Sequence, residues 1–181
     1  MFSQLLERIA LGLEQSQIPY MVIGGQAVLI YGEPRLTRDI DVTLGAGPER
    51  LQDLLALAQS AGWRLLVEKP EEFVQRTLVL PLQDAESGIR IDLIFSYSPY
   101  ERQALDRVRR VSVGKANVRF AAVEDVIVHK MIAGRPRDLE DVRGILLKNP
   151  TFDEAYIRRW LAEFDTSLGI CSVRTFDELT H

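Results

Sequence analysis

The feature that most constrains this chain is the stretch from residue 20 to residue 44, which reads YMVIGGQAVLIYGEPRLTRDIDVTL. Residues 20–23 are apolar and favour a strand, and residues 26–31 are an apolar segment that favours a short helix. Gly24 and Gly25 lie between them. A glycine turn at the start of a helix lets backbone N–H groups approach a phosphate, and the alternative is a tight turn that binds nothing.

Two aspartates open the strand that follows. Side chains alternate along a strand, so Asp39 and Asp41 lie on one face and the apolar residues next to them lie on the other. The two positions are roughly 6–7 Å apart, since a strand rises about 3.3 Å per residue, and both carboxylates can reach one hard cation or two adjacent ones. The alternative is a solvated polar face. The nearby glycine turn favours the metal site, because phosphate donors and metal-binding acids would then face each other.

A third aspartate lies inside residues 89–95, a run that otherwise reads as a buried strand. An unpaired charge in such a place is costly, so we expect Asp92 to be paired, metal-bound or exposed. Two explanations are open. Asp92 completes a metal site with the other two aspartates, or it pairs with Arg90 or points outward from an edge strand.

Together these motifs resemble the signature of the nucleotidyltransferase superfamily typified by DNA polymerase beta: a glycine pair, a spacer, Asp-x-Asp and a third aspartate on a later strand. The resemblance implies an α/β (α+β) fold, with a mixed β-sheet nucleotidyltransferase core flanked by helices. It also implies a metal-dependent enzyme that moves a nucleoside monophosphate from an NTP to an acceptor hydroxyl. The residues assigned on this basis are Asp39, Asp41 and Asp92 as catalytic ligands of Mg²⁺ (or Mn²⁺), and Gly24, Gly25, Arg38 and Lys130 as nucleotide-binding residues.

A closer likeness is to the minimal AbiEii-like nucleotidyltransferases of abortive-infection systems and to small antibiotic nucleotidyltransferases. Residues 123–142 are similar to a Glu-Asp, Lys, Arg-Asp-Leu-x-Asp stretch of the AbiEii-like group, so the resemblance covers about residues 20–147. It implies an RNA, tRNA or protein acceptor and a toxin–antitoxin or abortive-infection setting, with a cognate toxin or antitoxin as partner. Two alternatives are open: a catalytically silent nucleotide-binding or antitoxin-like partner module, and an enzyme that modifies a small antibiotic.

Within that stretch, residues 122–133 are expected to form a helix. Glu124 and Asp125 near its start suit the helix dipole, and capping is their expected role. Lys130, late in the helix, also suits the dipole, while the resemblance assigns it to nucleotide phosphate. Both interpretations of Lys130 are open.

A second helix is expected from residue 138 to residue 147, after a Gly-Arg-Pro-Arg breaker. Asp138 suits the cap of this helix. Asp138 and Asp141 share one helical face, from which they can hold Lys130 or Arg137 in place. A structural role is therefore favoured for both acids.

The order of elements predicts a nucleotidyltransferase core with an N-terminal helix over residues 1–120 and a C-terminal helical segment packed on it over residues 121–181, with a soft boundary. Residues 166–181 read as a poorly ordered tail or a partner-binding arm. The other expected elements are helices over residues 2–14, 48–61 and 102–109, strands over residues 63–67, 73–80, 89–95, 111–113 and 117–120, and turns over residues 69–72 and 83–88.

Composition narrows the class of protein further. The chain has 181 residues, 46% of them hydrophobic, which is enough for one sizeable core. No apolar run reaches the roughly 18 residues that span a membrane, and the N-terminus lacks the regions of a signal peptide, so we expect a cytoplasmic protein without membrane association. The single cysteine, Cys171, excludes an internal disulfide and is expected to be a packing residue.

The net charge of −4 argues against a general nucleic-acid coat protein, which needs clustered cations. Residues 101–119 are nevertheless locally basic, with six cations against two acids. This stretch is a candidate guide for an RNA acceptor, and a solvated basic face is the alternative. Arg35 and Arg38 flank the Asp-x-Asp motif and are better placed for a triphosphate.

Overall fold

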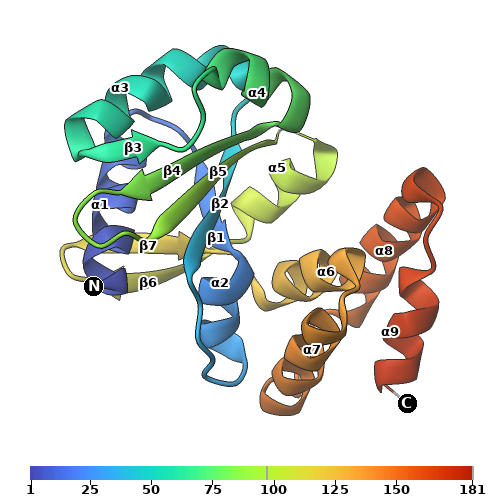
Figure 1. Cartoon of the computed structure of the whole chain (residues 1–181). Helices are drawn as coiled ribbons and strands as arrows, with labels where there is room; N and C mark the ends of the chain where they lie inside the picture. Colours follow the sequence, from blue (N-terminus) through green and yellow to red (C-terminus); the bar gives the residue numbers. More distant parts are fainter. Residues whose placement is uncertain (97, 181) are drawn as a thin grey trace.

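A computed structural model describes residues 1–96 and 98–180. Their strands are β1 (Tyr20–Ile23), β2 (Asp39–Gly45), β3 (Trp63–Leu65), β4 (Val79–Asp84), β5 (Arg90–Ser96), β6 (Arg109–Val113) and β7 (Ala116–Phe120). They form one mixed sheet in the order β3-β4-β5-β2-β1-β7-β6 (Figure 1). β2 pairs in parallel with β5, and β1 pairs in parallel with β7, whereas the other neighbours are antiparallel. β2 therefore lies in the middle of the sheet.

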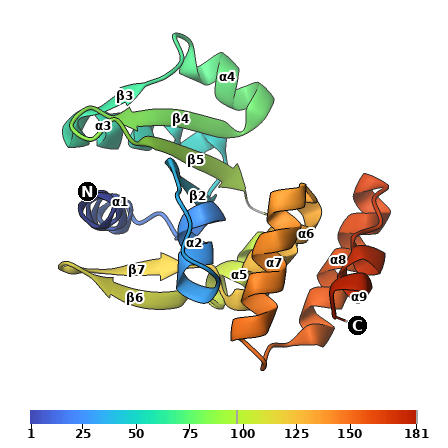
Figure 2. The ribbon, with the colours of Figure 1, turned by 60° about the horizontal axis from the view of Figure 1, so that its bottom comes forward.

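The helices are α1 (Phe2–Gln15), α2 (Gly24–Tyr31), α3 (Leu51–Ala61), α4 (Pro70–Thr77), α5 (Pro99–Asp106), α6 (Val123–Ala133), α7 (Pro136–Lys148), α8 (Glu154–Leu168) and α9 (Ser172–Thr180), with a 3-10 turn η1 (Pro48–Arg50) before α3. In Figure 2, α1 lies between the β6–β7 hairpin and α3, and it packs on both. Helices α6 to α9 lie together beside the sheet, where α6 also contacts α2. This contact brings the C-terminal helices to the glycine turn that begins α2.

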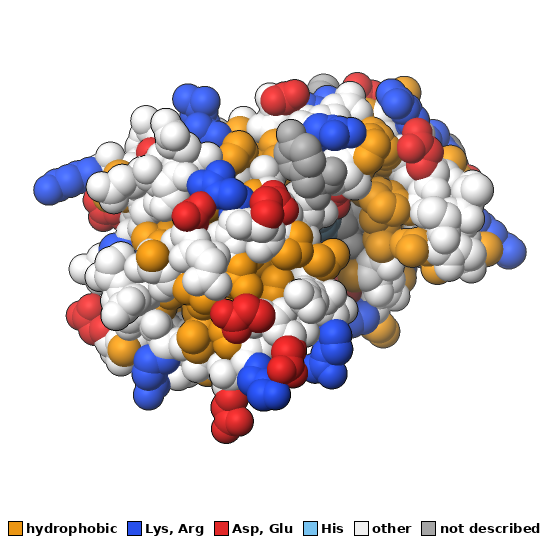
Figure 3. Space-filling view, turned by 90° about the horizontal axis from the view of Figure 1, so that it is seen from above, with side chains coloured by type: hydrophobic (Ala, Val, Ile, Leu, Met, Phe, Trp, Pro, Cys, Tyr) orange, Lys and Arg blue, Asp and Glu red, His pale blue; other side chains and the backbone are white. Residues whose placement is uncertain are grey.

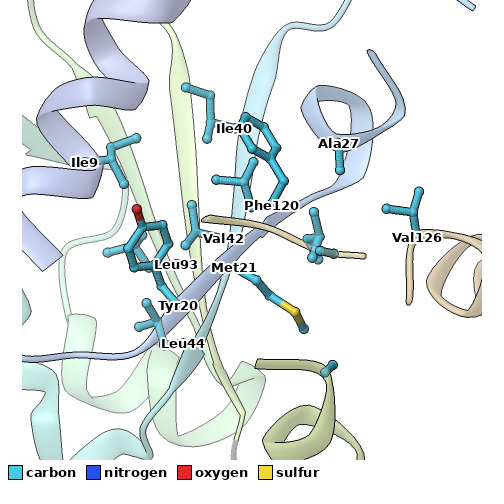
Figure 4. Close-up of a cluster of buried hydrophobic side chains, with 14 of the residues drawn as sticks. Ile9, Tyr20, Met21, Ala27, Ile40, Val42, Leu44, Leu93, Phe120 and Val126 are labelled. Carbon is cyan, nitrogen blue, oxygen red and sulfur yellow. The ribbon is translucent and has the colours of Figure 1, made fainter. Parts of the chain in front are cut away.

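The core follows from the strand pattern. In β2, Ile40, Val42 and Leu44 are fully buried, while Asp39 and Asp41 are only partly buried, so the expected alternation of faces is present. Figure 4 shows these apolar side chains meeting those of β1, β5, β7 and α1 in a cluster of buried side chains. The cluster continues into α6, α7, α8 and α9, so the C-terminal helices share the core of the sheet.

One predicted strand is wrong. Residues 73–80 were expected to be extended, but Pro70–Thr77 is helix α4, and only residues from Val79 onward are in β4. Proline in the first turn and two glutamates beside it favour a helix start, and these local signals outweigh the apolar spacing. The helix ends where Leu78 adopts a left-handed conformation with φ +56°.

The poorly ordered tail, one of the two alternatives for residues 166–181, is also wrong for the described residues up to 180, while the partner-binding arm stays a prediction. Residues 172–180 form α9, whose Phe176 is fully buried. Asp165 near the end of α8 accepts hydrogen bonds from the backbone N–H groups of Ser172 and Val173, and so fixes the start of α9. Cys171, expected to pack, is exposed in the connection between the two helices. His181 lies outside the described residues.

The surface seen from above the view of Figure 1 is mixed in charge. Lysine, arginine, aspartate and glutamate side chains alternate around a central group of hydrophobic side chains (Figure 3). That face carries no broad basic field, in line with the acidic net charge of the chain. No helix in residues 1–96 and 98–180 has both the length and the apolar character that crossing a membrane requires.

Candidate active site

The three predicted carboxylates come together on two neighbouring strands. Asp41 of β2 is directly opposite Asp92 of the parallel strand β5, and it is opposite Ile23, the last residue of β1, on the other side. Asp39 precedes Asp41 by one pleat and is on the same half-buried face of the sheet. The parallel pairing of β2 and β5 is what brings residues so distant in sequence to one place.

Gly24 forms the floor beneath these acids. Its φ is +64°, and a Cβ atom added there would lie 2.2 Å from Asp41 Oδ2, so only glycine permits both the turn and the close approach of the carboxylate. A Cβ at Gly25 would lie 2.4 Å from Thr37 Cγ2, which places the loop after α2 directly over the turn. Gln26 Nε2 donates a 2.6 Å hydrogen bond to Thr37 Oγ1 and holds that loop. The first backbone N–H groups of α2 therefore start beside the aspartates.

A cleft of about 590 Å³ opens at this turn. Three of the cations on its wall, Arg35, Arg38 and Arg137, come from the loop between α2 and β2 and from the start of α7. Arg38 is exposed, and within the described part of the chain it has no ion-pair partner. The complete lining is Gly24, Gly25, Arg35, Leu36, Thr37, Arg38, Asp39, Asp41, Lys130, Arg135, Arg137 and Asp138.

Lys130 is held in an ion-pair network between α6 and α7. Its Nζ lies 2.8 Å from Asp138 Oδ1 and 2.9 Å from Asp141 Oδ2, and its side chain is only 8% exposed. Arg135 Nε lies 2.6 Å from Asp138, and Arg35 Nε lies 3.2 Å from Asp141. Although burial raises the pKa of Asp138, the hydrogen bonds from Arg135 and Lys130 bring it below its ordinary value. The two acids hold Lys130 as expected, but Asp138 does not cap α7, which begins at Pro136 and has Arg135 as its N-cap residue. Lys130 still lines the cleft.

Asp41 lies where a negative charge is unfavourable. Burial, followed by the negative charges of Asp39 and Asp92, raises its pKa to about 6. Lys130 and Arg90 oppose this rise without cancelling it. A bound cation would remove the same repulsion, so the donor set of Asp39 and Asp41 fits a hard metal ion with oxygen ligands.

Asp92 has a different partner. Arg90 Nε donates to both carboxylate oxygens of Asp92, at 2.9 and 3.0 Å, as one of the two explanations from the sequence expected. In residues 1–96 and 98–180 no three acidic, histidine or cysteine side chains are grouped as ligands of one metal ion. The metal therefore fits Asp39 and Asp41 directly, and Asp92 would join them through the lone pairs that the single Arg90 N–H leaves free.

Glu124 and Asp125 do not cap α6, whose N-cap residue is Ala122. Glu124 accepts from Arg107 Nη2 at 2.8 Å and from the backbone N–H of Asp153 at 3.0 Å. Asp125 is fully buried and accepts a 2.7 Å hydrogen bond from the Tyr156 hydroxyl. Both acids therefore bind groups at the end of α5 and in α8, and these hydrogen bonds connect α6 to those helices.

Much of the basic stretch is engaged within the protein. Arg107 lies 3.9 Å above the Tyr156 ring, Arg109 lies 5.5 Å from the Tyr31 ring, and Arg119 lies 5.8 Å from the Tyr20 ring. β6 and β7, which carry two of these arginines, are on the far side of β1 from the aspartates. The cations nearest to the aspartates are instead Arg90 and those of the cleft wall.

Sequence reasoning missed two cleft residues, Thr37 and Arg135. Thr37 carries no signal of its own, since its importance comes from its contacts with Gln26 and the glycine turn. Arg135 lies in the helix-breaking segment between α6 and α7. Only its three-residue spacing to Asp138 could have indicated an ion pair.

A mixed sheet with a glycine turn over an Asp-x-Asp strand defines the class of nucleotidyltransferase-type proteins. The family model described as nucleotidyltransferase of unknown function (DUF6036) matches residues 2–172, and the chain belongs to this family. The superfamily expected from the sequence is thereby confirmed, while the AbiEii-like subgroup stays a prediction. A search of curated proteins finds no match.

Solved structures support the same fold. The solution structure of the antibiotic-resistance factor ANT(2″)-Ia has a TM-score of 0.63 at 15% identity, covering 99% of this chain and 97% of that one. A crystal structure of ANT(2″)-Ia in complex with adenylyl-2″-tobramycin has a TM-score of 0.62 at 16% identity, covering 92% and 98%. An antigenic nucleotidyltransferase-like protein from Paracoccidioides brasiliensis has a TM-score of 0.58 at 14% identity, covering 91% and 87%. The mixed α/β fold class is confirmed.

Proposed function

We propose that this protein is a metal-dependent nucleotidyltransferase that moves a nucleoside monophosphate from an NTP to an acceptor hydroxyl. The observation that carries the proposal is the contact between Gly24 and Asp41: a turn that opens a helix N-terminus lies directly against a carboxylate pair. Phosphate-binding N–H groups and metal-binding oxygens then serve the same triphosphate. The family supports the class of reaction.

Asp39 and Asp41 would hold Mg²⁺ (or Mn²⁺), and Asp92 would complete the ligand set. The ion would supply positive charge that stabilises the negative charge developing on the phosphate oxygens. The N–H groups of Gly25 and Gln26 bind the β- and γ-phosphates and orient them. Arg38, which has no partner among the described residues, is free to add charge-assisted hydrogen bonds.

Lys130 contributes to the same pocket from α6. Its two aspartate partners fix its position, so its ammonium group loses little further freedom when a phosphate arrives. Asp92 is the candidate acceptor for the proton of the attacking hydroxyl. Asp92 can accept this proton only through a lone pair that does not already accept the hydrogen bond from Arg90.

The first experiment measures thermal stability with each of the four NTPs, with and without Mg²⁺. A ligand that binds the folded state raises its apparent stability, by about 2.7 kcal/mol at a concentration of 100 times Kd. We expect a Mg²⁺-dependent shift that is absent in the double variant Asp39→Ala/Asp41→Ala. The matched control is Glu178→Ala, which removes an exposed acid on α9. A stable wild-type protein that responds to no NTP at millimolar concentration would refute the proposal.

A second candidate function is the modification of a small antibiotic, favoured by the fold shared with ANT(2″)-Ia along nearly the whole chain. ATP is the donor to test first, since the complex of that neighbour holds an adenylyl product. The toxin–antitoxin or abortive-infection setting, with a cognate partner and a cytoplasmic location, rests on the sequence resemblance and composition alone. A protein that binds NTP tightly with a co-purifying partner but never transfers nucleotide would indicate the silent module.

A further inference from the structure

A row of polar side chains crosses the sheet from the aspartates to its edge. Arg64 of β3 is directly opposite Gln83 of β4, Gln83 is opposite Arg90 of β5, and Arg90 is opposite Asp39 of β2. Directly paired residues point to the same face of a sheet, so these four side chains lie in line. Adjacent strands are about 4.8 Å apart, which puts the two arginine backbones about 10 Å from each other.

The row is open to solvent. Arg64 and Arg90 are exposed and Gln83 is partly exposed, whereas the neighbours of each residue on its own strand include side chains buried against the core. In the strand order, β3 and β4 lie on one side of β5, whereas β1 and the glycine turn that follows it lie on the other side of β2. A molecule that approaches Asp92 from the side opposite to the glycine turn would therefore meet this row.

Both arginines are held in position with donors to spare. Arg90 uses only Nε, which donates to the two oxygens of Asp92. Arg64 uses Nη2, which donates to Gln83 Oε1 at 2.8 Å. A guanidinium has five N–H donors, so in the part of the chain that the structure describes most donors of this pair have no partner. A fixed guanidinium with free donors in a plane is suited to a phosphate.

The carboxylates around the site are mostly neutralised. Asp92 is paired with Arg90, Asp138 with Lys130 and Arg135, and Asp141 with Lys130 and Arg35. Of the acids that line the cleft, only Asp39 and Asp41 have no ion-pair partner in residues 1–96 and 98–180, and the proposed metal takes both. No surplus of negative charge is left there to bind a polycationic acceptor such as an aminoglycoside.

We propose that the row of Arg64, Gln83 and Arg90 is the acceptor-binding surface, and that the acceptor carries a phosphate group near its reactive hydroxyl. This inference rests on the proposed function. The hydroxyl oxygen attacks the α-phosphorus of the NTP and forms the new P–O bond. The bond from the α-phosphorus to the bridging oxygen of the β-phosphate breaks, and pyrophosphate leaves with that electron pair. The hydroxyl proton passes to Asp92, which Arg90 holds beside the acceptor phosphate.

The test measures binding to phosphate-bearing and phosphate-free probes. One arm uses a fluorescent oligoribonucleotide and follows anisotropy over a range of salt concentrations. The second uses a nucleoside monophosphate as a small phosphate ester, and the third uses tobramycin. The two phosphate arms distinguish a nucleic-acid strand from a small ester as the source of the same chemistry.

We expect the wild-type protein to bind at least one phosphate probe and Arg64→Ala/Arg90→Gln to bind it at least tenfold more weakly. With an oligoribonucleotide, losing two phosphate contacts should reduce the slope of log K against log salt by about 1.4. Arg64→Ala alone, which leaves the Arg90–Asp92 pair untouched, should give part of the loss. Arg174→Ala, which removes an arginine that is 83% exposed on α9, is the control and should bind as wild type does.

Two results would overturn the inference: equal binding by the double variant and the control, or wild-type binding of tobramycin but of neither phosphate probe. Stabilisation by Mg²⁺ and NTP is measured on the same samples. If that stabilisation is present while the arginine variants bind the probes normally, the acceptor surface is wrong and the proposed function stands. If wild type shows no stabilisation by any NTP, the proposed function itself fails.

Discussion

Replacing Asp41 by asparagine should stabilise the folded protein while it abolishes metal-dependent NTP binding. Burial, and then the charges of Asp39 and Asp92, raises the pKa of Asp41 from 3.8 to about 6. Between these two values the carboxylate is ionised in the unfolded chain but protonated in the folded one. The unfolded state then binds fewer protons, so stability is lost as the pH rises from about 4 to about 6 and stays lost above it.

The size of the effect follows from the two pKa values. A difference of about two pH units corresponds to about 3 kcal/mol at roughly 1.36 kcal/mol per unit. Water reaches part of the Asp41 side chain, so this is an upper limit for Asp41→Asn at pH 7.5. For a chain of this size each kcal/mol changes Tm by about 2–4 °C, which predicts a rise of up to about 6–12 °C. At pH 4 the two proteins should differ little.

The assay is thermal and urea unfolding between pH 4 and pH 8, in the presence of EDTA so that no metal relieves the repulsion. Asp84→Asn is a matched control with the opposite sign. Although burial raises the pKa of Asp84, hydrogen bonds from Ser87 and Arg8 bring it below its ordinary value. Asp84 therefore contributes stability at pH 7 that is lost as the pH falls, and its replacement should destabilise. If Asp41→Asn unfolds at a lower temperature than wild type at pH 7.5, the electrostatic reasoning is refuted.

Three further changes test other parts of the structure. Gly24→Ala should cost roughly 1–2 kcal/mol for its left-handed backbone and also lose NTP binding, because the new Cβ displaces the Asp41 carboxylate; thermal shift with Mg²⁺ and NTP measures both. Lys130→Met should cost about 1–3 kcal/mol in urea unfolding, because Asp138 and Asp141 each lose one charged partner and keep one arginine, and a variant as stable as wild type would contradict the network. Tyr156→Phe removes the donor to buried Asp125 and should cost about 1–3 kcal/mol without changing NTP affinity, as unfolding and nucleotide titration can check.

Much of the site could be predicted because its signals are local. The alternation along β2 placed Asp39 and Asp41 on the polar face, and the glycine pair indicated the turn that begins α2. Even the partner of Asp92 was among the open explanations, since Arg90 is one pleat away on the same strand. Period and spacing within a single element sufficed for all of these.

Other features depend on contacts that no local pattern contains. Arg35 meets Asp141 only because α2 and α7 pack beside each other. The row from Arg64 to Asp39 depends on the register of four strands, and the sequence carried no signal for the order in which they pair. Helix α4 was missed although its signals are local. Its apolar residues have the spacing of a strand, whereas its proline and glutamates are typical of a helix start.

The two interpretations of Lys130 that the sequence left open are compatible in the structure. If Lys130 served only to join α6 and α7, we would expect the cations and acids of its cluster to be equal in number, so that the cluster carried no net charge. The cluster instead contains three cations, Lys130, Arg35 and Arg135, against Asp138 and Asp141. The cluster therefore has a net charge of +1 beside the cleft. The ion pairs also hold Lys130 in place, so its ammonium group cannot easily move away from the cleft. The same network thus stabilises the helix pair and presents a fixed positive charge where the proposed triphosphate would bind.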